Sequence, residues 1–162
     1  MACDEDKRHL ALTLVSRGLR AQEEGELEKA VELYRASLDI HPTAEGHTYL
    51  GWALSYAGQL DEAITHCREA IEIDPDFGNP YNDIGVYLMQ QRHLDEAIPW
   101  LERAKAARRY EPRHFPFVNL GSIYVWRGEL RRAIEEFKGA LELMPGDEGI
   151  ASAICELESK LN

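Results

Sequence analysis

The feature that most constrains this 162-residue chain is a set of small and apolar residues that recurs four times. One glycine recurs at steps of 33, 34 and 36 residues, and a leucine and an alanine recur at the same steps. The positions are Gly18, Gly51, Gly85 and Gly121; Leu27, Leu60, Leu94 and Leu130; and Ala30, Ala63, Ala97 and Ala133. A unit of about 34 residues cannot bury its apolar face alone, so such units stack on their neighbours. The spacing therefore predicts a repeat protein.

Each unit is expected to consist of two helices. In the second unit, Ala63, Ile64, Cys67, Ala70 and Ile71 form one apolar stripe at intervals of three and four residues. Prolines stand where helices should start or stop, and glycines stand where the chain should turn between paired helices. These residues are Pro42, Pro75, Pro80, Pro116 and Pro145, and Gly25, Gly58 and Gly128. After the last proline, an apolar face at helical spacing predicts a helix that covers the end of the stack.

The second halves of the units are LEKAVELYRASLDIHP, LDEAITHCREAIEIDP, LDEAIPWLERAKAARR and LRRAIEEFKGALELMP. Aligned in this way, the chain resembles the tetratricopeptide repeat (TPR) family. The resemblance implies an all-α fold, a right-handed α-solenoid of four TPR helical hairpins plus a C-terminal capping helix. It implies an N-terminal tail at residues 1–8, hairpins at about 9–43, 44–77, 78–112 and 113–146, and the capping helix at 147–162. The third unit departs from the pattern, with Arg109 in place of its final proline and two extra residues between Arg108 and His114.

Charge and composition exclude several classes of function. The formal net charge is −11 and the pI is near 5.0, which opposes binding to nucleic acid or to an anionic membrane surface. The N-terminus is acidic and no long apolar run follows it, so we expect neither export nor a membrane anchor. The three cysteines contain no C-x-x-C pair and suit a reducing compartment, which predicts a cytoplasmic protein.

No constellation of residues indicates catalysis. The six histidines are scattered, with no H-E-x-x-H motif, no Cys and His cluster at metal-ligand spacing and no phosphate-binding glycine loop. His66 precedes Cys67, but the repeat register places Cys67 at the buried position held by Tyr34, Leu101 and Phe137. We therefore interpret this cysteine as structural. The chain is expected not to be an enzyme, with no catalytic residues, cofactors or metal site.

The family resemblance also implies that the first helix of each unit lines a concave groove. Aromatic rings on that face would supply contact area, and asparagines would supply donors and acceptors for a peptide backbone. The candidate groove residues are Tyr49, Trp52, Tyr56, Asn79, Asn82, Asp83, Phe115, Asn119, Ser122 and Trp126. The alternative is that the rings pack against adjacent helices and that the asparagines are only solvated.

One subclass of the family grips the acidic C-terminus of heat-shock chaperones with Lys, Arg and Asn side chains. The corresponding positions here hold Val15, Leu19, Tyr49, Asn79 and Asp83. If the clamp positions are aligned one repeat unit further along the chain, they contain no lysine or arginine either. A chaperone tail is therefore not expected as a ligand.

A second candidate surface is a basic segment in an otherwise acidic chain. Its residues are Arg103, Lys105, Arg108, Arg109, Arg113, Arg131 and Arg132. It could receive an acidic partner or the acidic half of a second copy, and the alternative is an ordinary solvated helix face. The function we expect is a cytoplasmic adaptor or scaffold that binds a peptide segment of a partner protein in the groove. A self-associating scaffold, which builds a homo-oligomeric platform, is the alternative function.

Overall fold

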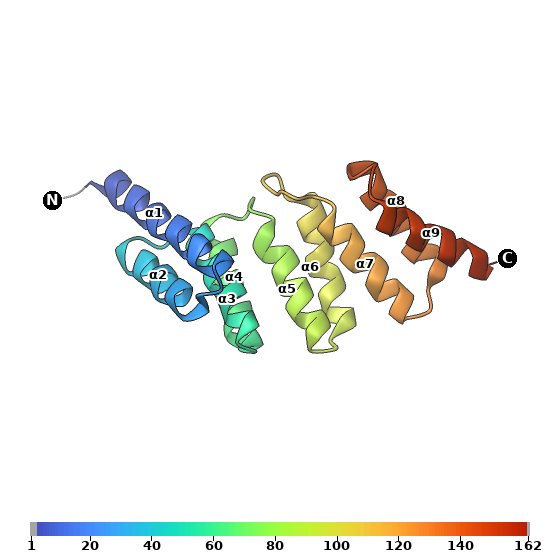
Figure 1. Cartoon of the computed structure of the whole chain (residues 1–162), viewed down its shortest axis with the longest axis horizontal. Coiled ribbons are helices and arrows are strands. Elements are labelled where there is room, and N and C mark those ends of the chain that lie inside the picture. The colour runs from blue at the N-terminus through green and yellow to red at the C-terminus, as the bar shows by residue number, and fades with distance from the viewer. Residues whose placement is uncertain (1–2, 162) are drawn as a thin grey trace.

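The computed structural model describes residues 3–161, which form nine α-helices and no strand. The helices are α1 (Asp4–Glu23), α2 (Leu27–Ile40), α3 (Ala44–Tyr56), α4 (Leu60–Ile73), α5 (Asn79–Gln90), α6 (Leu94–Ala106), α7 (Phe115–Trp126), α8 (Leu130–Leu143) and α9 (Glu148–Leu161). Figure 1 shows them in chain order along the long axis of the molecule, with the two chain ends at opposite ends. Helices α1 to α8 pack in consecutive pairs, and α9 packs on α8. The predicted all-α repeat solenoid is confirmed.

The paired helices approach each other closely at the recurring glycine of the first helix. A Cβ atom at Gly85 would lie 2.5 Å from a methyl carbon of Leu101, and one at Gly121 would lie 2.6 Å from the Phe137 ring. Protein interiors are close-packed, so any larger residue at these glycines would push the two helices apart. Each first helix thus lacks a side chain at the point where its partner helix inserts one.

The second hairpin keeps the glycine but has a smaller residue opposite it. A Cβ at Gly51 would lie 3.0 Å from the Ala63 carbonyl oxygen and 3.3 Å from Cys67 Sγ. Here the backbone of α4, rather than a long side chain, occupies the space beside the glycine. Cys67 is fully buried, and this burial raises the pKa of its thiol well above the usual range. An inaccessible, protonated thiol agrees with a structural role.

A residue in the left-handed region turns the chain inside each of the four hairpins. In three hairpins it is Gly25, Gly58 or Gly128, with φ of 82°, 78° and 74°. In the third hairpin it is Arg92, with φ of 66°. The turn geometry is therefore common to all four hairpins, although the glycine that marks it in the sequence is absent from the third.

The loop between α6 and α7 turns back onto the loop between α4 and α5. The Arg109 amide donates to the Asp76 carbonyl at 2.9 Å, and the Gly78 amide donates to the Arg109 carbonyl at 2.8 Å. This is the place where the third unit lacks its final proline and has two extra residues. The added length allows Tyr110 to be buried beside Gly78, which has no side chain to obstruct the ring.

The N-terminal helix starts earlier than expected. We predicted a tail over residues 1–8, but α1 begins at Asp4, while residues 1 and 2 lie outside the described part of the chain. The reason is a reciprocal cap: the Asp6 amide donates to Cys3 Sγ at 3.4 Å, and the Cys3 amide donates to Asp6 Oδ2 at 3.0 Å. Acidic residues in the first turn also interact favourably with the helix dipole.

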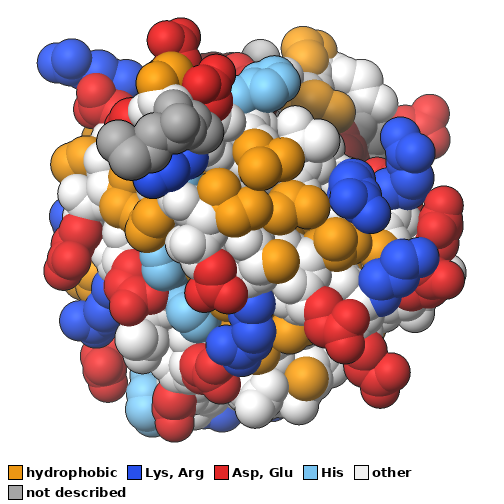
Figure 2. Space-filling model, turned by 90° about the vertical axis from the view of Figure 1, so that its left-hand side faces the viewer, with side chains coloured by type: hydrophobic (Ala, Val, Ile, Leu, Met, Phe, Trp, Pro, Cys, Tyr) orange, Lys and Arg blue, Asp and Glu red, His pale blue; other side chains and the backbone are white. Residues whose placement is uncertain are grey.

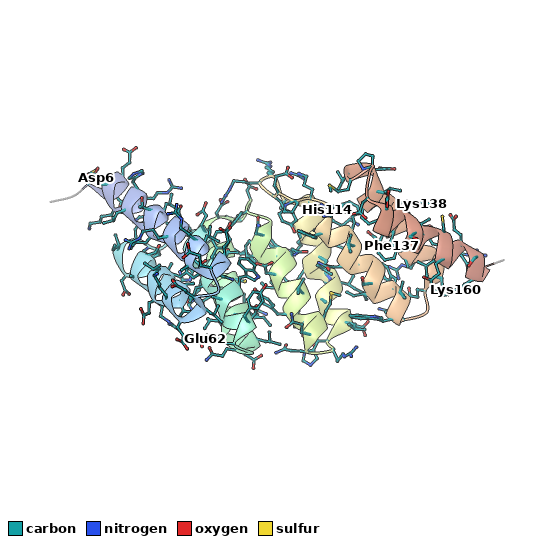
Figure 3. All side chains as sticks on the ribbon, viewed as in Figure 1. Asp6, Glu62, His114, Phe137, Lys138 and Lys160 are labelled. Carbon is teal, nitrogen blue, oxygen red and sulfur yellow. The ribbon has the colours of Figure 1, made fainter. Side chains whose placement is uncertain are left out.

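The last helix covers the C-terminal end of the stack. Asp147 Oδ1 accepts a hydrogen bond from the Ile150 amide at 2.9 Å, as an N-cap does. Three apolar residues of α9 are buried, whereas Leu161 is exposed. Lys138 on α8, labelled in Figure 3, pairs with Glu158 on α9 at 2.8 Å. Residue 162 lies outside the described part of the chain. The three buried apolar residues of α9 are Ile150, Ile154 and Leu157.

The opposite end of the solenoid carries α1 and α2. Figure 2 shows hydrophobic side chains gathered across the middle of this end, between acidic and basic ones. None of the helices within residues 3–161 is long and apolar enough to cross a membrane.

We expect Gly58→Ala to lower the free energy of unfolding by about 1 kcal/mol, because an L residue resists the left-handed conformation. No atom lies within 4 Å of the added Cβ, so the backbone cost acts alone. Gly146→Ala is the matched control, since its added Cβ also meets open space but its φ is not positive. Urea unfolding measures both changes, and equal effects would show that the turn does not require glycine.

Candidate functional site

The first helices of successive hairpins lie next to one another. Helix α3 contacts α1 and α5, and α5 contacts α7. Together with the α6–α7 loop, helices α3, α5 and α7 line a hollow of about 360 Å³, which we call the central groove. It is lined by Thr48, Tyr49, Trp52, Asn79, Asn82, Asp83, Val86, Tyr110, Pro112, Phe115 and Asn119.

Seven of the ten candidate groove residues meet in the central groove. They come from three different hairpins, and the helical period of each first helix places them on one side. These seven are Tyr49, Trp52, Asn79, Asn82, Asp83, Phe115 and Asn119. The structure thus brings together residues that are up to 70 positions apart in the sequence, from Tyr49 to Asn119.

The other three candidate residues lie elsewhere. Tyr56 lines a second hollow of about 310 Å³ between the first and second hairpins, and Trp52 lines both this hollow and the central groove. Ser122 and Trp126 line a third hollow of about 250 Å³ that also includes residues of α9. The candidate set therefore divides among three hollows along the same row of helices.

Asparagine side chains cross the central groove from α5 to α7. Asn119 Nδ2 donates to Asn82 Oδ1 at 2.9 Å, and Asn82 is only 7% exposed. The Asn82 side-chain oxygen therefore already accepts a hydrogen bond within the protein. Asn79 and Asn119 are more accessible than Asn82, so they are better placed to bond a ligand backbone.

Aromatic rings form a continuous row along α3. The ring centroids of Tyr49 and Trp52 lie 6.5 Å apart, and those of Trp52 and Tyr56 lie 5.7 Å apart. Tyr49 in turn stacks on the buried Tyr34 at 6.2 Å. Trp52 is 37% exposed and Phe115, on the α7 side of the groove, is 45% exposed. Rings held in this way offer apolar contact area at little entropic cost.

Asp83 is the acidic residue of the central groove. Desolvation raises its pKa from an ordinary value of 3.8 to about 7, while a hydrogen bond with Asn82 acts in the opposite direction. Burial likewise raises the pKa of the Tyr110 phenol, and the nearby Asp83 charge raises it further. Among the described residues that line the groove there is no lysine, arginine or histidine to neutralise this carboxylate.

Four lining residues are not among the ten candidates: Thr48, Val86, Tyr110 and Pro112. The last two lie in the α6–α7 loop, where no helical periodicity indicates which side chains face the groove. The available signal was the two-residue insertion in the third unit. His114, labelled in Figure 3, stands where this loop meets α7, and its ring lies 4.3 Å from that of Phe115.

The residues of the basic segment are mostly paired within the protein. Arg109 contacts Asp74 at 2.6 Å and Glu45 at 3.2 Å, and Lys105 contacts Glu136 at 3.0 Å. Three more are held in place: Arg103 over Tyr81 and Trp100, Arg113 by the Ala107 and Arg108 carbonyls, and Arg132 by Glu129 and Tyr124. Within residues 3–161, Arg108 and Arg131 form no ion pair. Acidic side chains therefore pair four of these seven cations: Lys105, Arg109, Arg132 and, at 3.9 Å from Glu111, Arg113.

Paired helices stacked in chain order, with a groove along the first helices, define an α-helical repeat solenoid. Models of the tetratricopeptide repeat match residues 44–77 and 81–109. The chain belongs to the tetratricopeptide repeat family. Proteins of this family generally mediate protein–protein interactions.

Two curated relatives illustrate how far the similarity extends. The small glutamine-rich tetratricopeptide repeat-containing protein 2 of Mycosarcoma maydis is 30% identical over 59% of this chain. The type IV pilus assembly protein PilF of Pseudomonas aeruginosa is 26% identical over 86% of it. This chain spans only 27% and 56% of the length of these two proteins.

Solved structures show the same fold at lower identity. P. aeruginosa PilF superposes with a TM-score of 0.88 at 24% identity, covering 95% of this chain and 70% of PilF. YrrB, described as a TPR protein with an unusual peptide-binding site, superposes with a TM-score of 0.70 at 19% identity. That match covers 90% of this chain and 74% of YrrB. These likenesses establish the fold.

We expect Asp83→Asn to stabilise the protein more at pH 8 than at pH 4.5, by about 3 kcal/mol. In the unfolded chain this carboxyl loses its proton near pH 4, whereas in the folded chain it keeps it until about pH 7. Its contribution to stability therefore falls as pH rises from about 4 to about 7, and asparagine removes that loss. Urea unfolding at both pH values, with the exposed Asp39→Asn as control, measures the difference. The same gain at both pH values would contradict a raised pKa.

Proposed function

We propose that this chain is a protein-interaction adaptor that holds a short segment of a partner protein in the central groove. One observation carries the proposal: seven candidate residues from three hairpins surround a single hollow with aromatic walls and asparagines. Exposed rings on opposite helices, Trp52 on α3 and Phe115 on α7, would hold apolar side chains of the segment. Asn79 and Asn119 would bond its backbone.

The charge of the groove restricts which segments fit. Aromatic and amide side chains surround Asp83, and a negatively charged segment would find no lysine, arginine or histidine among the described residues that line the groove. We therefore propose a neutral or basic segment rather than an acidic one. This argument also speaks against an acidic chaperone tail as the ligand.

The printed descriptions of two of the similar proteins support a binding role. YrrB is described as having a peptide-binding site, and PilF as taking part in pilus assembly. We propose that this chain too acts by binding and not by catalysis, and that it does so in the cytoplasm, where its free cysteines would stay reduced.

We expect Trp52→Ala to weaken binding of the partner segment by about 2 kcal/mol, a roughly 30-fold higher Kd, if the indole is an anchor. Partners would first be captured from native lysate with the wild-type chain, and the bound segment would then be measured by calorimetry. Phe115→Ala should weaken the same interaction, because its ring lies on the other side of the groove.

The matched control is Leu143→Ala. The exposed fraction of Leu143, 44%, is similar to that of Phe115. Leu143 lies on α8, however, and lines none of the three hollows. It should leave binding unchanged. Equal affinity of the wild type and both groove variants would remove the central groove as the binding site.

Self-association is the second candidate function, and the apolar end formed by α1 and α2 favours it. Light scattering would show a mass that rises with concentration if copies bind one another through this end. A constant monomer mass would leave the adaptor as the supported function.

A further inference from the structure

Two histidines and a glutamate that line none of the three hollows meet between the helices of the second hairpin. His47 lies on α3, and His66 and Glu69 lie on α4. The two Nδ1 atoms are 3.0 Å apart, and each is 2.9 Å from Glu69 Oε2. Three ligating atoms therefore form a nearly equilateral triangle.

Hydrogen bonding alone does not satisfy this triangle. Glu69 Oε2 is buried, and no hydrogen bond of acceptable geometry reaches it within the described chain, although two ring nitrogens lie 2.9 Å away. A neutral imidazole carries one proton, on one of its two nitrogens. If only one Nδ1 carries a proton and donates it to the other Nδ1, that second Nδ1 has no proton and its lone pair faces the carboxylate oxygen. If both hold protons, two N–H groups converge at 3.0 Å.

A metal ion resolves this conflict because all three atoms then present lone pairs to one cation. With metal–ligand distances of about 2.1 Å, an ion would stand about 1.2 Å above the triangle, with ligand–metal–ligand angles of about 90°. We propose that His47, His66 and Glu69 bind one divalent first-row transition-metal ion. Two imidazoles and a carboxylate on one side of the ion suit Zn²⁺, Co²⁺, Ni²⁺ or Fe²⁺ and leave further positions open.

The surroundings of the triangle fit a prepared site. The histidine side chains are only 13% and 17% exposed, and their rings lie 5.3 Å apart, so few other orientations are open to them. Glu62 Oε1 lies 3.9 Å from the far nitrogen of His66 and is itself held by Arg35 at 3.0 Å. Figure 3 places Glu62 at the edge of the molecule, near the start of α4. A carboxylate beside the outer nitrogen of a ligating histidine is typical of metal sites.

The consequence of binding would be a link between α3 and α4. Helix α3 carries Tyr49 and Trp52, so an ion at this site would hold the groove wall to its partner helix. The sequence showed no metal motif because the two histidines are 19 positions apart, and only the hairpin brings them together.

The test is calorimetric titration of the untagged, chelator-treated full chain with Zn²⁺. The wild type should bind one ion at this site, and Glu69→Gln should weaken that binding at least about tenfold. Glu69 is 46% exposed on its side chain, so glutamine should be tolerated in the fold. Zn²⁺ should also raise the Tm of the wild type and not that of Glu69→Gln or His66→Gln.

His93→Gln is the matched control, since His93 also lies near a glutamate, at 3.7 Å from Glu96, but belongs to no triangle. It should bind Zn²⁺ as the wild type does. No uptake by the wild type would overturn the proposal. So would unchanged uptake by Glu69→Gln and His66→Gln, which would assign the ion to other groups such as the exposed thiols of Cys3 and Cys155.

Discussion

The architecture depends on a steric contact at the point where the two helices of a hairpin meet. A glycine on the first helix leaves room for a residue of the second, and in three hairpins that residue is the large Tyr34, Leu101 or Phe137. Because the contact recurs at nearly the same position in each unit, the hairpins have similar shapes and stack in a regular row. Dispersion and burial along that row then stabilise the chain, since each unit alone would leave its apolar stripe in water.

The groove follows from this regular stacking. Helices α3, α5 and α7, with 13, 12 and 12 residues, lie next to one another, so residues at corresponding positions of these units face the same side. An irregularity of the repeat, the insertion before α7, pairs with the α4–α5 loop and brings Tyr110 and Pro112 to the groove. The regular part of the repeat thus supplies the walls, and the departure from it adds residues that a perfect repeat would not have.

The helices and much of the groove could be predicted from the sequence because both depend on local periodicity. A period of 3.6 residues places Tyr49 and Trp52 on one side of a helix without knowledge of the rest of the chain. Features that depend on contacts between distant segments could not be predicted. The triangle of His47, His66 and Glu69 exists only because α3 and α4 are antiparallel, and Tyr110 lies in a loop without periodicity. For the same reason the raised pKa of Asp83 follows from desolvation by its neighbours, which the sequence does not display.

Trp52 belongs to two hollows at once, and this has a consequence for the ligands that could be recognised. Side chains seated in the two hollows would be separated by little more than one indole ring. In an extended chain, side chains on the same side recur every second residue, at about 7 Å. Recognition would then rest on the interval between two apolar residues rather than on either residue alone. Segments of quite different composition could bind if they kept that interval, and a single inserted residue would abolish binding.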